Sequence, residues 1–179
     1  LSPAAFARLA VRSIKAPAYR RRWRERLALQ RLPEQRDLAA PLIWIHAVSV
    51  GETVAATPLV KQLRHDYPTH QILITSTTPT GSARVIELFG DTVLHAYLPY
   101  DTVGAMRRFV RKFQPSLLIL METELWPNLI HACSRREVPV VLANARLSVR
   151  SSRGYKRFAG LTRPMLRELE LVAAQSEED

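Results

Sequence analysis

The sequence predicts an α/β fold in which a parallel sheet carries helices on both faces. Short apolar runs alternate with longer segments of helical periodicity along the chain, as in successive βαβ units. Two of the runs, LLIL at 117–120 and VVLA at 140–143, are apolar throughout, which is typical of strands covered on both sides. The 179 residues suffice for one domain with a sizeable core.

Six apolar runs are strand candidates, and five segments of helical character separate or follow them. The strand candidates are residues 42–46, 71–75, 93–97, 116–121, 139–143 and 170–174. The helix candidates are residues 52–66, 80–89, 101–113, 125–136 and about 153–168. In the first of these helices Leu59, Val60 and Leu63 form an apolar stripe that suits packing on a sheet. Strand–helix–strand connections of this kind are right-handed and give parallel strands.

The charge of the chain is concentrated at its N-terminus. Residues 1–31 hold nine basic side chains and one acid, which accounts for eight of the ten net positive charges. The parts of this region are two short helices at 4–14 and 18–30 and a linker at 31–41. We therefore expect two regions, a basic amphipathic helical arm and linker over 1–40 and an α/β domain over 41–179.

The basic arm favours a location at an anionic membrane surface. Tyr19, Trp23 and Leu27 recur at helical spacing among the arginines, a pattern typical of helices that lie on such surfaces. The alternative is a solvated helix whose aromatic side chains pack on the domain. No apolar run is long enough to span a bilayer, and no secretory signal is evident. The single Cys133 excludes a disulfide within the chain. Both ends look like cuts, so we expect a piece of a longer protein.

Open parallel sheets bind ligands outside the carboxyl ends of their strands, so the residues after each strand candidate form the candidate site. The first strand ends at His46, which we expect to be a hydrogen-bonded core residue, and SVGET follows at 49–53. Ser49 supplies a hydroxyl, and Gly51 permits a tight turn or a close approach to a ligand. Glu52 has two interpretations, a general base at the edge of a cleft or a carboxylate that stabilises the first turn of a helix.

Two further strand ends carry polar groups. Glu122 and Glu124 follow the fourth strand candidate and would point the same way if the strand continued, so that repulsion raises the pKa of one of them. The alternative is that the Thr-Glu pair caps the next helix. After the second strand, STTPTGS at 76–82 offers a cradle for an anion or phosphate. The alternative there is helix capping by Thr78 or Thr80.

The segment after the fifth strand is rich in arginine. ANARLSVRSSRGYKR at 143–157 places Asn144, Arg146 and Ser148 ahead of further basic residues. Arginines among hydroxyl groups suit the binding of phosphate or carboxylate, and the alternative is a solvated basic helix. The five histidines show no metal-ligand spacing, so no metal site is predicted.

These segments resemble, in order, the motifs of a known family. HAVSVGET, TSTTPTGS, YLPYD, METELWPNL, ANARLS and AAQSEED are similar to motifs of the bacterial transferases of Kdo (3-deoxy-D-manno-octulosonic acid), which act in lipopolysaccharide biosynthesis. KAPAYRRRWRER also resembles the basic stretch that follows the membrane anchor of that family. The resemblance covers nearly the whole chain, and six ordered motifs make it specific.

The resemblance implies a GT-B architecture of two Rossmann-like domains, of which this chain is the N-terminal acceptor domain and the C-terminal donor domain is absent. It implies inverting transfer of Kdo from CMP-Kdo to the lipid A precursor (lipid IVA), with no metal or other cofactor. It implies that Glu52 is the general base and that a second catalytic acid lies in ETELWPN, which we assign to Glu124. The substrate-binding residues expected from the motifs are Ser49, Gly51, Thr78, Thr80, Glu122, Asn144, Arg146 and Ser148.

The partners implied are the lipid A precursor, CMP-Kdo held through the absent domain, and an anionic membrane surface at the cytoplasmic face of the bacterial inner membrane. No nucleic acid is expected, because the basic residues lie on an arm that lacks the aromatic residues of RNA-binding modules. We expect the isolated chain to be inactive. Two alternatives stay open, a GT-B glycosyltransferase with another acceptor on the same scaffold and a non-enzymatic basic binding module.

Overall fold

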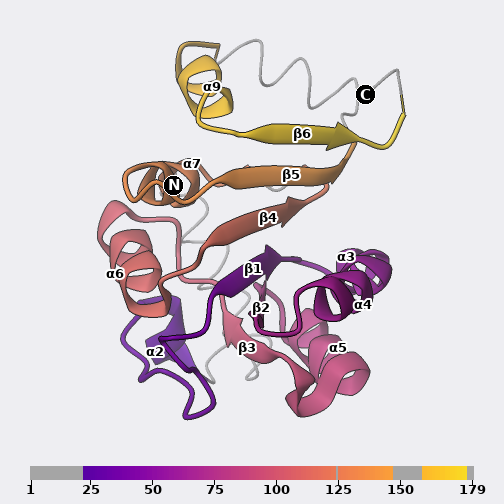
Figure 1. Cartoon of the computed structure of the whole chain (residues 1–179). Helices are drawn as coiled ribbons and strands as arrows, with labels where there is room; N and C mark the ends of the chain where they lie inside the picture. The colour runs from indigo at the N-terminus through magenta and orange to yellow at the C-terminus, as the bar shows by residue number, and fades with distance from the viewer. Residues whose placement is uncertain (1–21, 124, 147–158, 177–179) are drawn as a thin grey trace.

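The computed structural model describes residues 22–123, 125–146 and 159–176 (Figure 1). Several sequence predictions therefore lie outside the described residues. These are the helix at 4–14, the first part of the helix at 18–30, the start of the helix at 153–168, and the site residues Glu124 and Ser148.

The centre of the fold is a sheet of six parallel strands in the spatial order β3-β2-β1-β4-β5-β6. The strands are β1 Leu42–His46, β2 Gln71–Ser76, β3 Leu94–Tyr97, β4 Leu117–Met121, β5 Val140–Ala145 and β6 Leu171–Ala174. All six predicted strands are confirmed, with small shifts of their ends. The order reverses between β1 and β4, and in sheets of this type the loops at such a switch point flank the ligand crevice.

Helices cover both faces of the sheet, so the predicted α/β fold is confirmed (Figure 1). One face carries α2 Trp23–Arg26, α6 Val103–Phe113, α7 Pro127–Ser134 and α9 Ala159–Leu166. The other carries α3 Val50–Ala55, α4 Thr57–Asp66 and α5 Pro79–Phe89, which is followed by the 3₁₀ turn η2 Gly90–Thr92. None of the described helices is long and apolar enough to cross a bilayer.

Alternation along the strands divides the core into two layers. In β1, Leu42 and Trp44 pack toward α6 and α7, whereas Ile43 and Ile45 pack toward α4 and α5. The Trp44 ring is fully buried, and its centroid lies 4.9 Å from that of Phe109 on α6. Every side chain of β1 is buried, which explains why the central strands read as continuous apolar runs. This rigid sheet fixes the loops at its carboxyl edge.

The segment predicted as one helix at 52–66 is two helices in the structure, and that prediction is wrong in this detail. α3 ends at Ala55 and α4 begins at Thr57, with Pro58 in the first turn of α4. Proline has no N–H group to donate to the carbonyl of Val54, and its ring would clash with that carbonyl in a regular helix. The break leaves α3 as a short helix that carries Glu52.

Residues 22–40 pack on the α/β body. The Glu25 carboxylate accepts a hydrogen bond of 2.8 Å from the backbone N–H of Tyr97, on edge strand β3. The buried Arg26 donates to the carbonyl of Thr77 at 2.7 Å. The helix predicted at 18–30 ends at Arg26, because Ala28 has a φ of 56° and its backbone leaves the helical region.

Arg36 joins this N-terminal segment to the end of α6. The side chain is 7% exposed, and its Nη2 donates to the carbonyl of Phe113 at 2.9 Å. Its Nη1 donates to the carbonyl of Ala40 and to Oε1 of Gln71, both at 2.9 Å. Burial lowers the pKa of Arg36, and the neighbouring Asp37 opposes that shift. The guanidinium therefore satisfies carbonyl groups that the chain leaves unpaired where α6 ends.

Candidate functional site

The loop between β1 and α3 places Glu52 at the switch point of the sheet. Ser49 is the N-cap of α3, and its hydroxyl accepts a hydrogen bond of 3.2 Å from the backbone N–H of Glu52. The Glu52 carboxylate reaches back and accepts one of 2.7 Å from the backbone N–H of Val48. This reciprocal pattern is a capping arrangement, so Glu52 does stabilise the first turn of α3. The bond from Val48 also holds the carboxylate in one position, as catalysis requires.

Glu52 is 5% exposed, and burial raises its pKa. Hydrogen bonds from Val48 and Ser49 oppose that shift, whereas the negative charge of Glu122 adds to it. Glu122 follows β4 with a φ of 57°, and its backbone N–H donates to the carbonyl of Ala143 at 2.9 Å. Because β1 and β4 are adjacent, the loops after them place Glu52 and Glu122, 70 residues apart in the sequence, near enough for their charges to interact.

The loop after β2 is tied to the loop after β1. Thr78 caps α5 by accepting from the N–H of Gly81 at 3.0 Å, and its hydroxyl donates to the carbonyl of Val48 at 3.1 Å. A Cβ atom on Gly81 would lie 2.9 Å from that same carbonyl oxygen. At Gly51, by contrast, the nearest atom to a Cβ would be Ser49 Oγ at 3.8 Å. The close backbone approach therefore occurs at Gly81, which sequence reasoning did not single out, and not at Gly51.

Asp101 is a second residue of the site region whose role sequence reasoning missed. Its carboxylate, 5% exposed, accepts from the backbone N–H groups of Asn128 at 3.2 Å and Leu129 at 3.0 Å. Asn128 Nδ2 returns a bond of 2.8 Å to the carbonyl of Asp101. Burial raises the pKa of Asp101, and the bonds from Asn128 and Leu129 oppose this shift. Asp101 thus caps α7 from another loop and fixes the LWPN segment. The feature of the sequence that could have identified it is an acid that follows a strand.

His46 ends β1 beneath this site and is fully buried, as expected of a core histidine. Its Nδ1 lies 3.1 Å from the carbonyl oxygen of Thr75, which can only accept, so Nδ1 carries the proton. Burial lowers the pKa of His46 to about 4, and the bond to Thr75 opposes this shift. Its Nε2 is buried without a hydrogen-bond partner in the described structure, and the ring stands edge-on to Trp126 at 5.9 Å.

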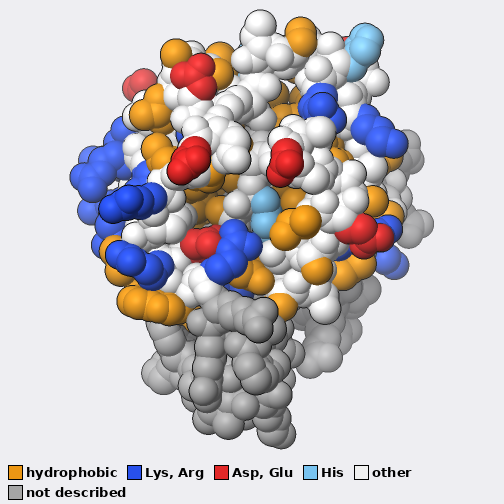
Figure 2. Space-filling model, turned by 90° about the horizontal axis from the view of Figure 1, so that it is seen from below, with side chains coloured by type: hydrophobic (Ala, Val, Ile, Leu, Met, Phe, Trp, Pro, Cys, Tyr) orange, Lys and Arg blue, Asp and Glu red, His pale blue; other side chains and the backbone are white. Residues whose placement is uncertain are grey.

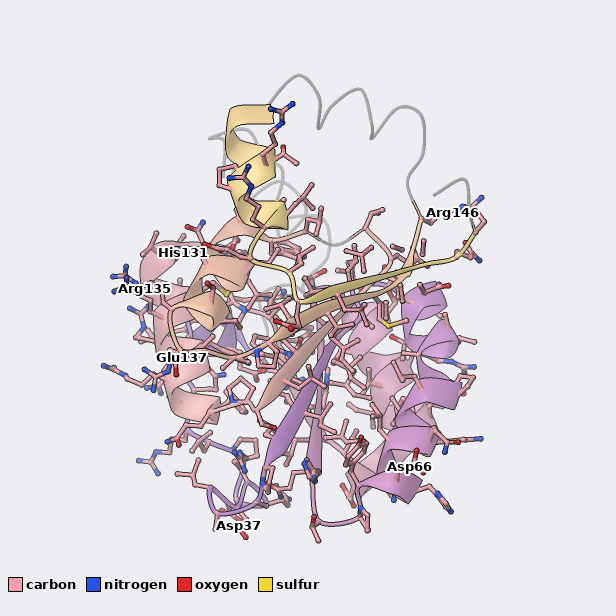
Figure 3. The ribbon with its side chains drawn as sticks, turned by 45° about the horizontal axis from the view of Figure 1, so that its top comes forward. Asp37, Asp66, His131, Arg135, Glu137 and Arg146 are labelled. Atoms are coloured by element: carbon pink, nitrogen blue, oxygen red, sulfur yellow. The ribbon has the colours of Figure 1, made fainter. Side chains whose placement is uncertain are left out.

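The remaining predicted residues lie along the same edge with different exposure. Thr80 is exposed, and its hydroxyl lies 3.5 Å from that of Thr78. Asn144 is half-buried with a φ of 55°, at an irregularity in the pairing of β5 with β6. Arg146 follows β5 and is exposed (Figure 3). The structure gathers Ser49, Glu52, Thr78 and Glu122 around the switch point, whereas Glu124 and Ser148 lie outside the described residues.

This arrangement can act as a proton acceptor held beside a negative charge. A carboxylate whose pKa is raised by burial and by a neighbouring carboxylate is a better base than a solvated one. Among the described residues, no three His, Cys, Asp or Glu side chains come together in a way that could hold a metal ion.

Comparison with known proteins identifies relatives of this chain. Residues 21–179 match the family model described as 3-deoxy-D-manno-octulosonic-acid transferase (kdotransferase). The 3-deoxy-D-manno-octulosonic acid transferase of Haemophilus influenzae is 49% identical over 164 residues, which cover 91% of this chain and 38% of that protein. The enzyme of the same name from Bordetella pertussis is 44% identical, over 79% of this chain and 34% of the relative. The chain thus spans less than two-fifths of the length of these relatives.

Solved structures with a similar fold are much more distant in sequence. The UDP-GlcNAc 2-epimerase of Neisseria meningitidis has a TM-score of 0.55 at 14% identity, covering 77% of this chain and 41% of that protein. MurG of Acinetobacter baumannii has a TM-score of 0.53 at 11% identity, covering 75% of this chain and 41% of that protein. These two likenesses support the fold alone. The family model and the close relatives show that this chain belongs to the Kdo transferase family.

Proposed function

We propose that the protein containing this chain transfers Kdo from CMP-Kdo to a hydroxyl group of the lipid A precursor lipid IVA, with inversion. In this proposal the chain is the acceptor half of a GT-B enzyme, and a second domain binds most of the donor. The family membership supports the Kdo transfer. The buried, reciprocally bonded Glu52 at the switch point is the single structural observation that carries the mechanism.

Inverting transfer is a single displacement, so it requires one base that takes the proton of the attacking hydroxyl. Glu52 is positioned for that role because the backbone N–H of Val48 holds its carboxylate, while its own backbone N–H is bonded to the Ser49 hydroxyl. Its raised pKa strengthens it as a proton acceptor, and Glu122 contributes to the shift. We assign Glu122 to binding of the acceptor and Glu124 to the second catalytic role. No step of this scheme requires a metal or another cofactor from the chain.

The remaining parts of the proposal concern the surroundings of the site. Ser49, Thr78, Thr80, Asn144, Arg146 and Ser148 would contact the hydroxyl and phosphate groups of the acceptor. A lipid acceptor with phosphate groups lies in an anionic membrane, so we place the reaction at the cytoplasmic face of the bacterial inner membrane. The basic residues near the N-terminus support that location, because cations near such a surface each contribute about 1 kcal/mol of attraction.

The test is the variant Glu52→Gln in the full protein that contains this chain. An amide oxygen can still accept from Val48 N–H, so the capping arrangement and the fold are retained while the base is lost. We expect the turnover number for Kdo transfer to lipid IVA, followed by mass spectrometry of the lipid, to fall by roughly 10²–10⁴-fold. Because a buried carboxylate is replaced by a neutral group, the melting temperature should be unchanged or higher.

The matched control is Glu87→Gln, the same change at an exposed position of α5, which should leave turnover unchanged. Turnover by Glu52→Gln within a few-fold of the wild type would remove Glu52 as the base. If the wild type itself attaches no Kdo to lipid IVA, the acceptor assignment is wrong. Transfer to another acceptor would then indicate the alternative glycosyltransferase, and binding without any transfer would indicate a non-enzymatic module.

A further inference from the structure

A groove lined by arginines lies between α6 and α7, on the face of the sheet opposite to α3, α4 and α5. Its volume is about 430 Å³. It is lined by Gly104, Arg107, Arg108, Arg111, Ala132, Arg135 and Arg136. A Cβ on Gly104 would lie 3.4 Å from Nη1 of Arg108, one turn further along α6, so the guanidinium lies close over this glycine. Five arginine side chains, three on α6 and two directly after the end of α7, therefore line one hollow.

The positive charge of this groove is not neutralised by any ion pair within residues 22–123, 125–146 and 159–176. Arg107, Arg111, Arg135 and Arg136 are exposed, and none of them forms an ion pair within the described part of the molecule. Arg108 donates from Nη2 to the carbonyl of Leu27 at 2.8 Å, while its Nε is buried without a hydrogen-bond partner. Figure 2 shows Lys and Arg side chains gathered on the flank that carries α6 in Figure 1.

The charges lining the arginine groove differ from those lining a second groove of the described structure. A groove of similar volume, about 390 Å³, is lined by Arg64 together with His70 and Asp91, so an acid is present there. Next to the arginine groove, the pKa of Lys112 is lowered by burial and by the charges of Arg108 and Arg111. Like charges held together in this way repel one another, and a bound anion would relieve that repulsion.

The chemistry of the groove points to phosphate groups as its ligand. A guanidinium presents a planar fork of N–H donors that matches two oxygens of a phosphate, and its charge is permanent. Several forks from α6 and from the turn after α7 suit an anion with more than one negative charge. The groove also lies away from the carboxyl edge, since Arg135 at the end of α7 and Arg146 after β5 occupy opposite sides of the molecule (Figure 3).

We propose that the groove between α6 and α7 is a phosphate-binding site separate from the Glu52 crevice. It takes the phosphate groups of a polyanionic ligand or of an anionic lipid surface, and it goes beyond the proposed transfer reaction. Its evidence is the groove itself, so its test does not depend on whether Kdo is transferred.

The experiment compares two double variants of the full protein that carry the same change in charge. Arg111→Glu with Arg135→Glu reverses one arginine on each wall of the groove. The control, Lys61→Glu with Arg64→Glu, reverses two exposed basic residues on α4, across the sheet. Binding of inorganic pyrophosphate is measured by titration calorimetry, and binding to vesicles of phosphatidylcholine with and without phosphatidylglycerol is measured by sedimentation. Circular dichroism establishes that both variants fold.

We expect the groove variant to bind at least tenfold more weakly, because each lost contact between a guanidinium and an anion is worth roughly a tenfold change in affinity. The control should resemble the wild type. If the groove variant loses pyrophosphate binding, the groove binds soluble phosphate ligands and needs no membrane. The wild type could instead bind vesicles with phosphatidylglycerol but not pyrophosphate. If only the groove variant then loses the vesicle binding, the phosphates are those of a lipid surface. Equal binding by the two variants in both assays would overturn the proposal.

Discussion

His46 shows how one buried residue makes the stability of the chain depend on pH. Its ring is fully enclosed between Thr75 and Trp126, where a charged imidazolium would be poorly solvated. In the unfolded chain the same ring is hydrated and takes up a proton near its ordinary pKa of 6.5, whereas in the folded chain it does so only near 4. The unfolded state therefore binds more protons between these pH values, and stability falls as the pH is lowered.

The expected size of this effect follows from the difference between the two pKa values. The contribution of His46 is fully present above pH 6.5 and lost progressively toward pH 4, and it amounts to about 3 kcal/mol. His46→Asn keeps an N–H group for the carbonyl of Thr75 but cannot titrate. We measure the free energy of unfolding of both proteins in urea at a series of pH values. As the pH falls, that of the wild type should drop by this amount relative to that of the variant. Parallel curves would contradict the account.

At the scale of elements, the important contact is between the loop after β1 and the start of α5. Gly81 N–H and the Val48 carbonyl both bond to the hydroxyl of Thr78, so the two loops share one hydrogen-bonded centre. The backbone of α5 approaches the first loop so closely that only hydrogen fits at Gly81. α5 thereby supports the loop that carries Glu52.

Two glycine-to-alanine variants test this contact. Gly81→Ala puts a methyl group 2.9 Å from the rigid carbonyl oxygen of Val48, and we expect it to lower the free energy of unfolding by about 1–3 kcal/mol. Gly51→Ala is the matched control in the first turn of α3, where space is open, and it should be neutral or stabilise by about 0.5–1 kcal/mol. Chemical denaturation measures both, and similar losses in the two variants would show that the contact is not decisive.

Much of this architecture could be predicted from the sequence. The strands were found because buried parallel strands read as short apolar runs, and Glu52 and Glu122 were found because strand ends mark the ligand edge. The proximity of Glu52 and Glu122 was not predicted from the sequence, since Glu122 was expected to act with Glu124. Which loops meet depends on the strand order, and no local pattern encodes that order. The roles of Gly81 and Asp101 depend on contacts with other loops and were missed for the same reason.

At the scale of the whole molecule, residues 22–40 are attached to the α/β body at edge strand β3 and at the end of α6. Glu25 occupies a backbone donor of edge strand β3, which would otherwise be open to another strand. Arg22 and Arg26 stack on the Tyr97 ring, with centroid distances of 4.7 Å and 4.0 Å. Arg36 closes the end of α6. The expected boundary at residue 40 stays a prediction, but the described part of the arm is packed against the domain.

Arg36 provides the test at this scale. Arg36→Met keeps an apolar stem and removes the donors to Phe113, Ala40 and Gln71, so their buried oxygens lose a charged partner. We expect the free energy of unfolding to fall by about 2–4 kcal/mol. Arg31→Met, at an exposed position of the same segment, should change it by less than about 0.5 kcal/mol. Thermal and urea unfolding give both values, and a small effect at Arg36 would mean that the segment is only loosely attached.

The bond between Val48 and the Glu52 carboxylate links the order of a loop to the affinity of a proton. A carboxylate that gains a proton accepts hydrogen bonds less strongly, so proton uptake at Glu52 loosens the start of α3. Thermodynamic reciprocity then requires the converse. Whatever tightens this loop lowers the proton affinity of Glu52, and whatever loosens it raises that affinity. A ligand that rests on the β1–α3 loop therefore adjusts the basicity of Glu52 without touching the carboxylate.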